Sequence, residues 1–227
     1  AAANAVTSEL KPNQTIAISW GRGLEATVLH CKKESIPGLK ITQLMGALSN
    51  VGTSVSADDI GRTLARNLNA TFVPFNAPVV VSNQKIRNSL LEESQISQVL
   101  DLARHANIAL VGIGSHASSS SEMVLDEFHL PEKERSLIGA EYAGDIAARF
   151  YNNAGKIINA VMDSRVIGLS LEEIRKIPRV IGVANGTEKV LGVIGAARAK
   201  LVDALVIDLA CANSILKFLA TTEAVSA

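Results

Sequence analysis

An arginine stands between two glycines at Gly21, Arg22 and Gly23, with two residues between them and the apolar residues 16–18. This order predicts a buried strand that turns sharply into a helix. Glycines let the backbone approach a ligand closely, and the first N–H groups of a helix lack intrahelical partners, so such a turn can hold an anion. The guanidinium of Arg22 adds a fixed set of donors that suits a phosphate. A turn that merely joins strand and helix is the alternative.

A second turn of this kind is predicted at residues 185–189, which include Gly186 and Lys189. The positive charge of a lysine in the first turn of a helix interacts unfavourably with the helix dipole. Its presence there indicates a nearby anion that compensates the charge. An exposed lysine that binds nothing is the alternative.

Glycines and polar residues that follow other predicted strands could face the rest of a ligand, because open α/β sheets bind ligands at the carboxyl ends of their strands. Gly112, Gly114 and Ser115 follow one such strand. His116 beside them could titrate or hydrogen-bond a ligand, although a lone histidine in a loop is more often simply exposed.

Two more positions could line the same site. Gly46 opens residues 46–52 after another predicted strand, and this segment is equally typical of a plain loop. Asp145 stands at the start of a predicted hairpin, where its carboxylate could accept hydrogen bonds from sugar hydroxyls. The same carboxylate could instead accept hydrogen bonds from local backbone N–H groups.

Short β-rich runs alternate with longer helical patterns, which predicts an α/β fold with a doubly wound, mainly parallel, Rossmann-like sheet. The predicted strands are residues 15–19, 39–44, 70–73, 108–111, 180–184 and 204–208. The predicted helices are residues 24–34, 57–68, 84–103, 171–176, 187–200 and 210–219. Several of these helical patterns open with a capping-type residue, such as Ser56, Ser94 or Ser170.

Residues 152–155, Asn-Asn-Ala-Gly, have the composition of a tight turn. They predict a small β-hairpin flap at the sheet edge, in which residues 144–151 pair with residues 156–160. The four serines at 118–121 predict a polar, mobile loop that a bound ligand would order. No linker or repeat divides the chain, so we expect residues 1–227 to form one ligand-binding domain.

The composition is that of a globular domain with an aliphatic core, since 48% of the 227 residues are hydrophobic and the mean hydropathy is +0.24. Basic and acidic residues both number 22, which argues against nucleic-acid binding by this chain. No apolar run could cross a bilayer and no signal-peptide pattern is present, so we expect a cytoplasmic protein with no membrane partner. Cys31 and Cys211 lack metal-ligand spacing and are predicted to be buried thiols, and we expect no metal or cofactor.

Five of these segments together resemble the SorC family of bacterial sugar-responsive transcription regulators, in particular its C-terminal effector-binding domain. The resemblance covers almost the whole chain, with the motifs in the expected order and spacing. The matching segments are residues 18–22 (Ile-Ser-Trp-Gly-Arg), 111–114 (Val-Gly-Ile-Gly), 144–146 (Gly-Asp-Ile) with Arg149 and Phe150, 165–169 (Arg-Val-Ile-Gly-Leu), and Gly186 with Lys189.

The resemblance implies a fold related to glucosamine-6-phosphate deaminase and ribose-5-phosphate isomerase, with a phosphorylated sugar as effector. By position, residues 21–23 correspond to the family's phosphate-cradling turn, Lys189 to a basic residue that meets the phosphate, and Asp145 to a residue that faces the sugar. The family commonly has a threonine where this chain has Gly23. It also has an acidic residue where Leu209 follows Asp208, which puts a sugar-facing role for Asp208 in doubt.

The resemblance further implies a homo-oligomer, a dimer or tetramer, that binds operator DNA through an N-terminal helix-turn-helix domain absent from this chain. The alternative function is a sugar-phosphate isomerase or deaminase on the same fold. The glycine-rich stretch before His116 is similar to that of the deaminases, but Ser115 stands where they have an Asp-Gly pair that supplies the acid/base carboxylate. Glu141, Asp145 or Asp163 could substitute for it.

Overall fold

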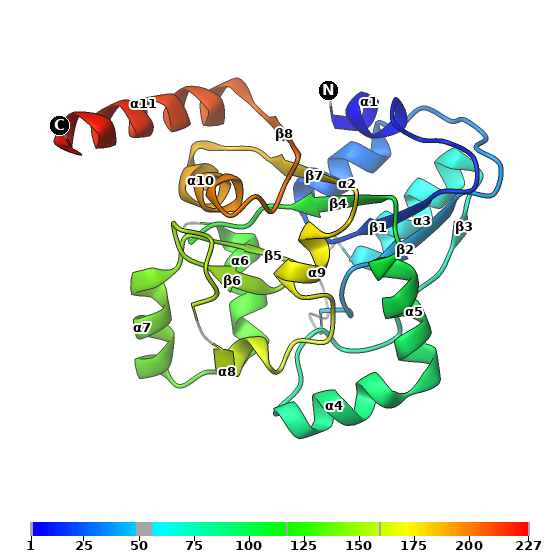
Figure 1. The fold of residues 1–227 in the computed structure, drawn as a ribbon, viewed down its shortest axis with the longest axis horizontal. Helices are drawn as coiled ribbons and strands as arrows, with labels where there is room; N and C mark the ends of the chain where they lie inside the picture. Colours follow the sequence, from blue (N-terminus) through cyan, green and yellow to red (C-terminus); the bar gives the residue numbers. More distant parts are fainter. Residues whose placement is uncertain (1, 49–55, 117, 159, 227) are drawn as a thin grey trace.

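Six parallel strands form the central sheet of this computed structural model, in the order β3-β2-β1-β4-β7-β8 (Figure 1). The structure describes residues 2–48, 56–116, 118–158 and 160–226. The strands are β1 Thr15–Ile18, β2 Lys40–Gln43, β3 Thr71–Phe72, β4 Ile108–Gly112, β7 Arg179–Ala184 and β8 Ala204–Ile207. Each predicted strand agrees with the observed one to within one residue at either end, so the predicted doubly wound α/β fold is confirmed.

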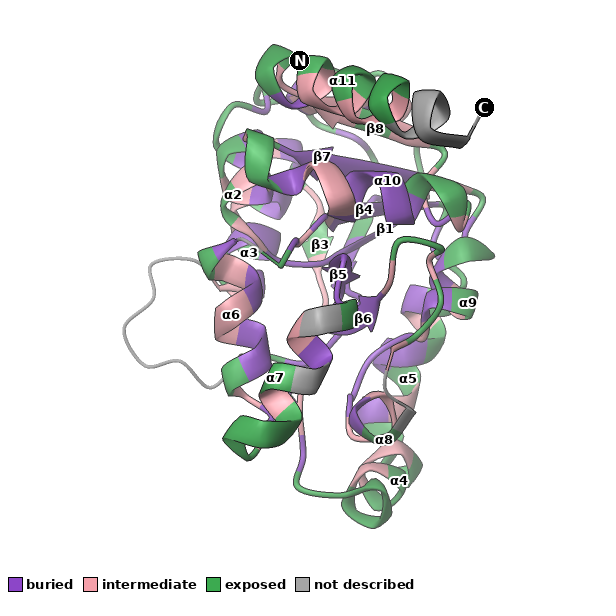
Figure 2. Cartoon of the chain, turned by 90° about the vertical axis from the view of Figure 1, so that its left-hand side faces the viewer, coloured by how far each residue is buried: buried purple, intermediate pink, exposed green. Residues whose placement is uncertain are grey.

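Helices cover both faces of the sheet. Helices α2 and α3 pack together on one face and α5 packs on the other (Figure 2). Strands β1 and β4 are buried between these layers, as expected for parallel strands that read as nearly continuous apolar runs. The helices are α1 Ala2–Thr7, α2 Arg22–Leu29, α3 Ala57–Leu68, α4 Gln84–Glu92, α5 Ser94–Arg104, α6 Ser119–Asp126, α7 Glu132–Glu141, α8 Ala160–Asp163, α9 Leu171–Arg175, the 3₁₀-helix η1 Thr187–Lys189, α10 Val190–Arg198 and α11 Leu209–Ser226.

Two of the predicted N-caps are confirmed. The Ser56 hydroxyl accepts the N–H of Asp59 at the start of α3, and Ser170 forms a reciprocal capping box with Glu173 at the start of α9. Ser94 is instead the first residue of α5. The single helix predicted over residues 84–103 is wrong, because Glu93 is extended (ψ 127°) and divides the segment into α4 and α5.

The predicted mobile serine loop is also wrong. Ser118 and Ser121 are buried, and the serines open a helix, α6. Neither α6 nor α7 was predicted from the sequence. Serine disfavours helix interiors because its side chain competes for backbone hydrogen bonds, but at a helix start the same property is favourable.

The hairpin exists with a different turn. Strand β5 (Gly144–Ile146) pairs antiparallel with β6 (Arg149–Tyr151), and Ala147 and Ala148 form the turn with φ of 51° and 62°. Alanine carries no sequence signal for positive φ, so this turn could not be predicted. Residues 152–155 do reverse the chain, and the described residues after them pair with β6 through an isolated bridge between Tyr151 and Ile157 and a backbone hydrogen bond from Ile158 to Phe150. The hairpin is fully buried rather than a flap at the edge.

Arg149 fixes the hairpin in place. Its guanidinium, 1% exposed, donates hydrogen bonds to the carbonyls of Asp163, Gly168 and Leu169 at 2.6, 2.9 and 3.1 Å. It also lies 3.0 Å from the carboxylate of Asp163. A buried guanidinium is tolerated only where its donors are satisfied, so this arginine ties β6 to the segment that precedes α9.

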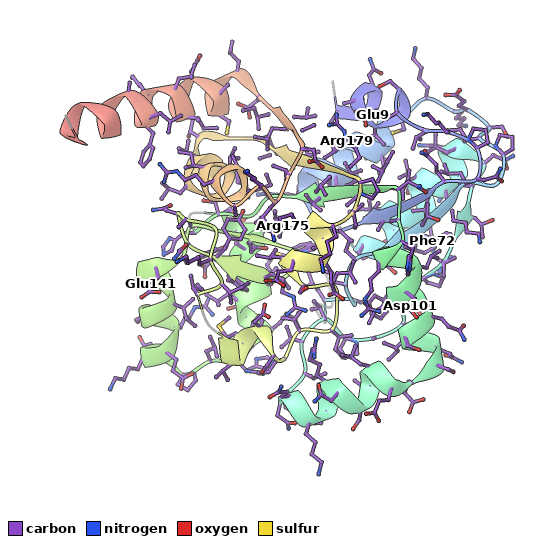
Figure 3. The ribbon with its side chains drawn as sticks, viewed as in Figure 1. Glu9, Phe72, Asp101, Glu141, Arg175 and Arg179 are labelled. Atoms are coloured by element: carbon purple, nitrogen blue, oxygen red, sulfur yellow. The ribbon has the colours of Figure 1, made fainter. Side chains whose placement is uncertain are left out.

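A second ion pair joins the segment after α1 to the sheet. Nε and Nη2 of Arg179, at the start of β7, donate to the two carboxylate oxygens of Glu9 at 2.8 and 2.6 Å (Figure 3). Both cysteines are buried and free, as predicted. Within the described residues, no helix is both long and apolar enough to cross a bilayer.

Candidate functional site

A cavity lies where the strand order reverses. From the neighbouring strands β1 and β4 the sheet grows in opposite directions, to β2 and β3 on one side and to β7 and β8 on the other. Ligands of open α/β sheets bind outside the carboxyl ends of the strands at such a point. The cavity is lined by the segments that follow β1, β4 and β7, by α6 and by the hairpin: Trp20, Gly21, Arg22, Gly23, Gly112, Ile113, Gly114, Ser120, Ser121, Asp145, Ala147, Val183, Ala184, Asn185, Glu188 and Lys189.

The first wall is the turn between β1 and α2. Gly21 is the N-cap of α2 and has a φ of 136°, which a residue with a side chain rarely adopts. Gly112 allows β4 to approach this turn, since a Cβ there would lie 2.7 Å from the carbonyl oxygen of Trp20. Arg22 is exposed at the rim, and its Nη2 donates to the Ser119 hydroxyl at 3.1 Å.

The second wall is η1, which brings in Lys189. This side chain is only 8% exposed, and its Nζ lies 3.4 Å from the Ser120 hydroxyl. Burial lowers the pKa of Lys189, while the carboxylates of Asp145 and Glu188 favour its charged form. Two cations from different turns therefore face the same cavity, and both contact the start of α6.

The third wall is a buried carboxylate, Asp145 of β5. Its Oδ1 accepts hydrogen bonds from the Ser121 hydroxyl at 2.6 Å and from the Tyr142 hydroxyl at 2.8 Å. Ser121 in turn accepts the backbone N–H of Ser115 at 2.9 Å. Gly114 makes room for this network, because a Cβ there would lie 1.8 Å from Oδ1 of Asp145.

Burial raises the pKa of Asp145, and the hydrogen bonds from Ser121 and Tyr142 and the charge of Lys189 oppose the rise. Burial also raises the pKa of the Tyr142 phenol, so Tyr142 acts as a donor to the carboxylate at neutral pH. Both hydrogen bonds from described residues to this carboxylate end on Oδ1. The carboxylate therefore retains acceptor capacity towards the cavity.

The structure brings together seven of the residues selected from the sequence: Gly21, Arg22, Gly23, Gly112, Gly114, Asp145 and Lys189. They come from four separate segments of the chain and line a single cavity. A side chain at Gly23 would meet Cγ1 of Val183 at 3.3 Å, so glycine leaves room on this wall.

Four other selected residues do not line the cavity. Ser115 lies buried behind it, and Gly186 is the N-cap of η1 with a φ of 99°. Asp208 accepts the N–H of Gly186 at 2.5 Å and the N–H of Cys211 at 2.7 Å, which lowers its pKa. Its observed contacts are thus structural, with backbone groups at the starts of η1 and α11. Gly46 packs against the backbone of residues 77 and 78.

Two other candidates from the sequence are not found among the described residues that line the cavity. Residues 49–52 of the segment after Gly46 are outside the described residues. His116 is exposed, with its ring 5.6 Å from the ring of Tyr142.

Sequence reasoning places Asn185 and Glu188 in a candidate turn without selecting either, and it misses Ser120, Ser121 and, behind Asp145, Tyr142. The run of serines was visible, but the helix that orients it was not. Tyr142 precedes the hairpin by two residues and carries no motif of its own.

The arrangement suits a ligand with one anionic end and one polar end. Among the residues that the structure describes, no carboxylate forms an ion pair with Arg22 or Lys189. Their charge, with the free N–H groups at the start of α2, can be directed to an anion. The described part of the chain also contains no cluster of three or more potential metal ligands among its His, Cys, Asp and Glu residues.

Fold and cavity define a ligand-binding α/β domain with a polar site at the switch point of its sheet. Residues 1–217 match the family described as "Putative sugar-binding domain", and the chain belongs to this family. The resemblance to the regulators of the SorC family is thereby confirmed, and the chain is a sugar-binding domain of the kind found in transcriptional regulators.

Curated relatives include the deoxyribonucleoside regulator of Bacillus subtilis, 26% identical over 199 residues, which covers 88% of this chain and 63% of the relative. The sorbitol operon regulator of Klebsiella pneumoniae is 26% identical over 210 residues, 92% of this chain and 66% of the relative. The chain thus spans about two thirds of the length of these relatives. A crystal structure of a transcriptional regulator from Streptococcus pneumoniae superposes with a TM-score of 0.88 at 25% identity, over 96% of this chain and 83% of that one.

Proposed function

We propose that the cavity binds a phosphorylated sugar, with the phosphate between Arg22 and Lys189 and the sugar hydroxyls towards Asp145. One observation carries the proposal: a guanidinium and a buried ammonium from two different turns face one cavity, and neither forms an ion pair with a carboxylate of the described residues. A dianionic phosphate could accept charge-assisted hydrogen bonds from both cations. The carboxylate of Asp145 accepts hydrogen bonds from hydroxyls but repels a phosphate, which orients the ligand.

We further propose that this domain, spanning residues 1–227, belongs to a cytoplasmic homo-oligomeric regulator, a dimer or tetramer. Its DNA-binding part would lie outside these residues, in the third of the relatives that this chain does not match. The bound sugar phosphate would then control operator binding. The names of the relatives, a deoxyribonucleoside regulator and a sorbitol operon regulator, support a sugar-derived effector.

An enzyme acting on sugar phosphates is the second candidate. Asp145 favours it, because a buried carboxyl with a raised pKa beside a lysine is a possible general acid or base. The relatives named as regulators favour sensing without turnover.

A thermal-shift screen tests the proposal with pentose, hexose and ketose phosphates, the corresponding free sugars and inorganic phosphate. A ligand at a hundred times its dissociation constant stabilises by about 2.7 kcal/mol, which is roughly 5–11 °C for a domain of this size. A shift from a sugar phosphate that mass spectrometry recovers unchanged supports the sensor. Consumption of the ligand supports the enzyme, and a shift from free sugars alone contradicts the phosphate site.

A further inference from the structure

The first turn of α6 reaches the cavity with backbone donors that its own N-cap leaves free. The N-cap is Ser118, and its side chain makes no capping hydrogen bond. The N–H groups of Ser121 and Glu122 donate to the carbonyl of Ser118, at 3.1 and 3.2 Å. Within the described residues, the N–H groups of Ser119 and Ser120 have no backbone acceptor. Free N–H groups at a helix start suit an anion.

A buried cation lies next to this helix start. Lys189 is only 8% exposed, and Nζ has one hydrogen-bond partner among the described residues, the Ser120 hydroxyl at 3.4 Å. An ammonium has three N–H donors, so two of them remain for a ligand. Unused donors on a buried charge cost free energy unless a ligand satisfies them. Lys189 therefore indicates, independently of the helix, an anion between η1 and α6.

Each of the two cations of the cavity is matched with one serine of this turn. Nη2 of Arg22 donates to the Ser119 hydroxyl at 3.1 Å, and Nζ of Lys189 lies beside the hydroxyl of the next residue, Ser120. A hydroxyl that accepts a hydrogen bond from a cation still has its own proton to donate. Ser120 also lies 3.3 Å from the Ser118 hydroxyl, a long contact that a charged acceptor can replace.

We propose that the first turn of α6 binds a terminal phosphate, with Ser119 and Ser120 as hydroxyl donors. This role rests on the sugar-phosphate function proposed above and specifies the anionic group of the ligand. The two cations, two hydroxyls and two N–H groups offer more donors than the about four hydrogen bonds that the two oxygens of a carboxylate accept. A phosphate monoester has three free oxygens and up to two charges. The site therefore selects sugar phosphates over sugar acids.

The same turn also fixes the other end of the proposed ligand site. Ser121 directly follows the two phosphate donors, and its hydroxyl donates to Asp145 at 2.6 Å. Figure 1 shows α6 beside β5 and β6, the hairpin that carries this carboxylate. One helical turn thus sets the distance between the phosphate and the carboxylate that accepts sugar hydroxyls.

Fluorescence of Trp20 can report binding, because this residue is the single tryptophan of the chain and lines the cavity. The probes are methyl phosphate, dimethyl phosphate and acetate, at about pH 8, where the phosphate monoester is a dianion. We expect a saturable change with methyl phosphate at concentrations at which the other two probes give none. The double variant Ser119→Ala, Ser120→Ala should bind methyl phosphate at least about tenfold more weakly.

Ser94→Ala is the matched control, because Ser94 is an exposed serine that begins another helix, α5, and does not line the cavity. This variant should bind methyl phosphate as the wild type does. Ser120→Thr keeps the hydroxyl and should retain most of the affinity that Ser120→Ala loses. Equal melting temperatures of all variants without a ligand would show that the fold is retained.

Three results overturn the proposal. The first is a wild type whose fluorescence methyl phosphate leaves unchanged at every concentration. The second is a double variant that binds methyl phosphate as tightly as Ser94→Ala does, which would leave Arg22 and Lys189 as the anchors. The third is equal affinity for methyl phosphate and acetate. A sugar phosphate that stabilises the wild type and the double variant equally would refute the role of α6 alone and leave the proposed function intact.

Discussion

The Ser121 hydroxyl lies 2.6 Å from Oδ1 of Asp145, and this contact joins the start of α6 to the buried hairpin. The same hydroxyl accepts the N–H of Ser115 at the end of the β4 segment. One serine thus joins the end of the β4 segment, the start of α6 and the hairpin. Arg22 and Lys189 also contact this helix start, so α6 connects the two proposed phosphate anchors to the carboxylate.

Ser121→Ala removes this junction and should destabilise the ligand-free domain by about 1–3 kcal/mol, because it leaves buried polar groups without a partner. The melting temperature should fall by about 2–12 °C. Ser119→Ala is the control, since Ser119 is exposed and contacts only Arg22 among the partners seen here. Equal melting temperatures for the two variants would show that the junction contributes nothing to stability.

Arg22→Ala should weaken the binding of a sugar phosphate about 10- to 100-fold, because one charge-assisted contact to the phosphate is lost. The melting temperature of the free domain should hardly change, since Arg22 is exposed. Isothermal titration calorimetry measures the affinity. An unchanged dissociation constant would rule out Arg22 as an anchor.

Lys189→Met is the matching change at the second anchor, and methionine keeps the buried volume while removing the charge. Affinity for the sugar phosphate should fall by a similar factor, while any affinity for the free sugar should stay the same. Titration of both ligands into the variant separates the two effects. Equal losses for both ligands would indicate a general distortion of the cavity instead of a phosphate contact.

The pKa of Asp145 is raised by burial above its ordinary value of 3.8, so the folded protein binds this proton more tightly than the unfolded chain. The contribution of Asp145 to stability is therefore full below pH 3.8 and is lost as pH rises through the raised pKa. The amide oxygen of Asp145→Asn can still accept hydrogen bonds from Ser121 and Tyr142. Because an amide does not ionise, the variant should not lose this stability as pH rises. Between pH 3.8 and the raised pKa, the unfolding free energy of the variant minus that of the wild type should therefore increase by up to about 1.4 kcal/mol per pH unit.

Urea unfolding of the wild type and of Asp145→Asn at a series of pH values measures this difference. Comparing the two proteins cancels the contributions of Asp208 and Glu173, whose pKa values are lowered and whose effect has the opposite sign. A constant difference across the series would mean that Asp145 ionises as freely in the folded protein as in the unfolded chain.

Arg149→Met should destabilise the fold by about 3–5 kcal/mol, since it leaves Asp163 and several buried carbonyls without their donor. The melting temperature should fall by about 6–20 °C. Arg62→Met is the control, because the ion pair of Arg62 with Asp58 is exposed and contributes less than about 1 kcal/mol. A similar effect of both substitutions would contradict the structural role assigned to Arg149.

The strands could be predicted because a parallel sheet buried on both faces requires apolar runs of limited length, and the glycines that follow β1 and β4 mark their ends. The anchors Arg22 and Lys189 could be selected because they stand at turns of this sheet. The predictions that failed concern features that depend on tertiary contacts. The positive φ of Ala147 and Ala148, the helix started by Ser119, and the hydrogen bond from Gly186 to Asp208 arise from packing that local sequence does not specify.

The most direct test is a crystal structure of the domain with the sugar phosphate that gives the largest thermal shift. We expect phosphate oxygens about 2.7–2.9 Å from the guanidinium of Arg22 and from Nζ of Lys189, and a sugar hydroxyl donating to Asp145. A phosphate directed to solvent, or bound away from these two side chains, would contradict the account.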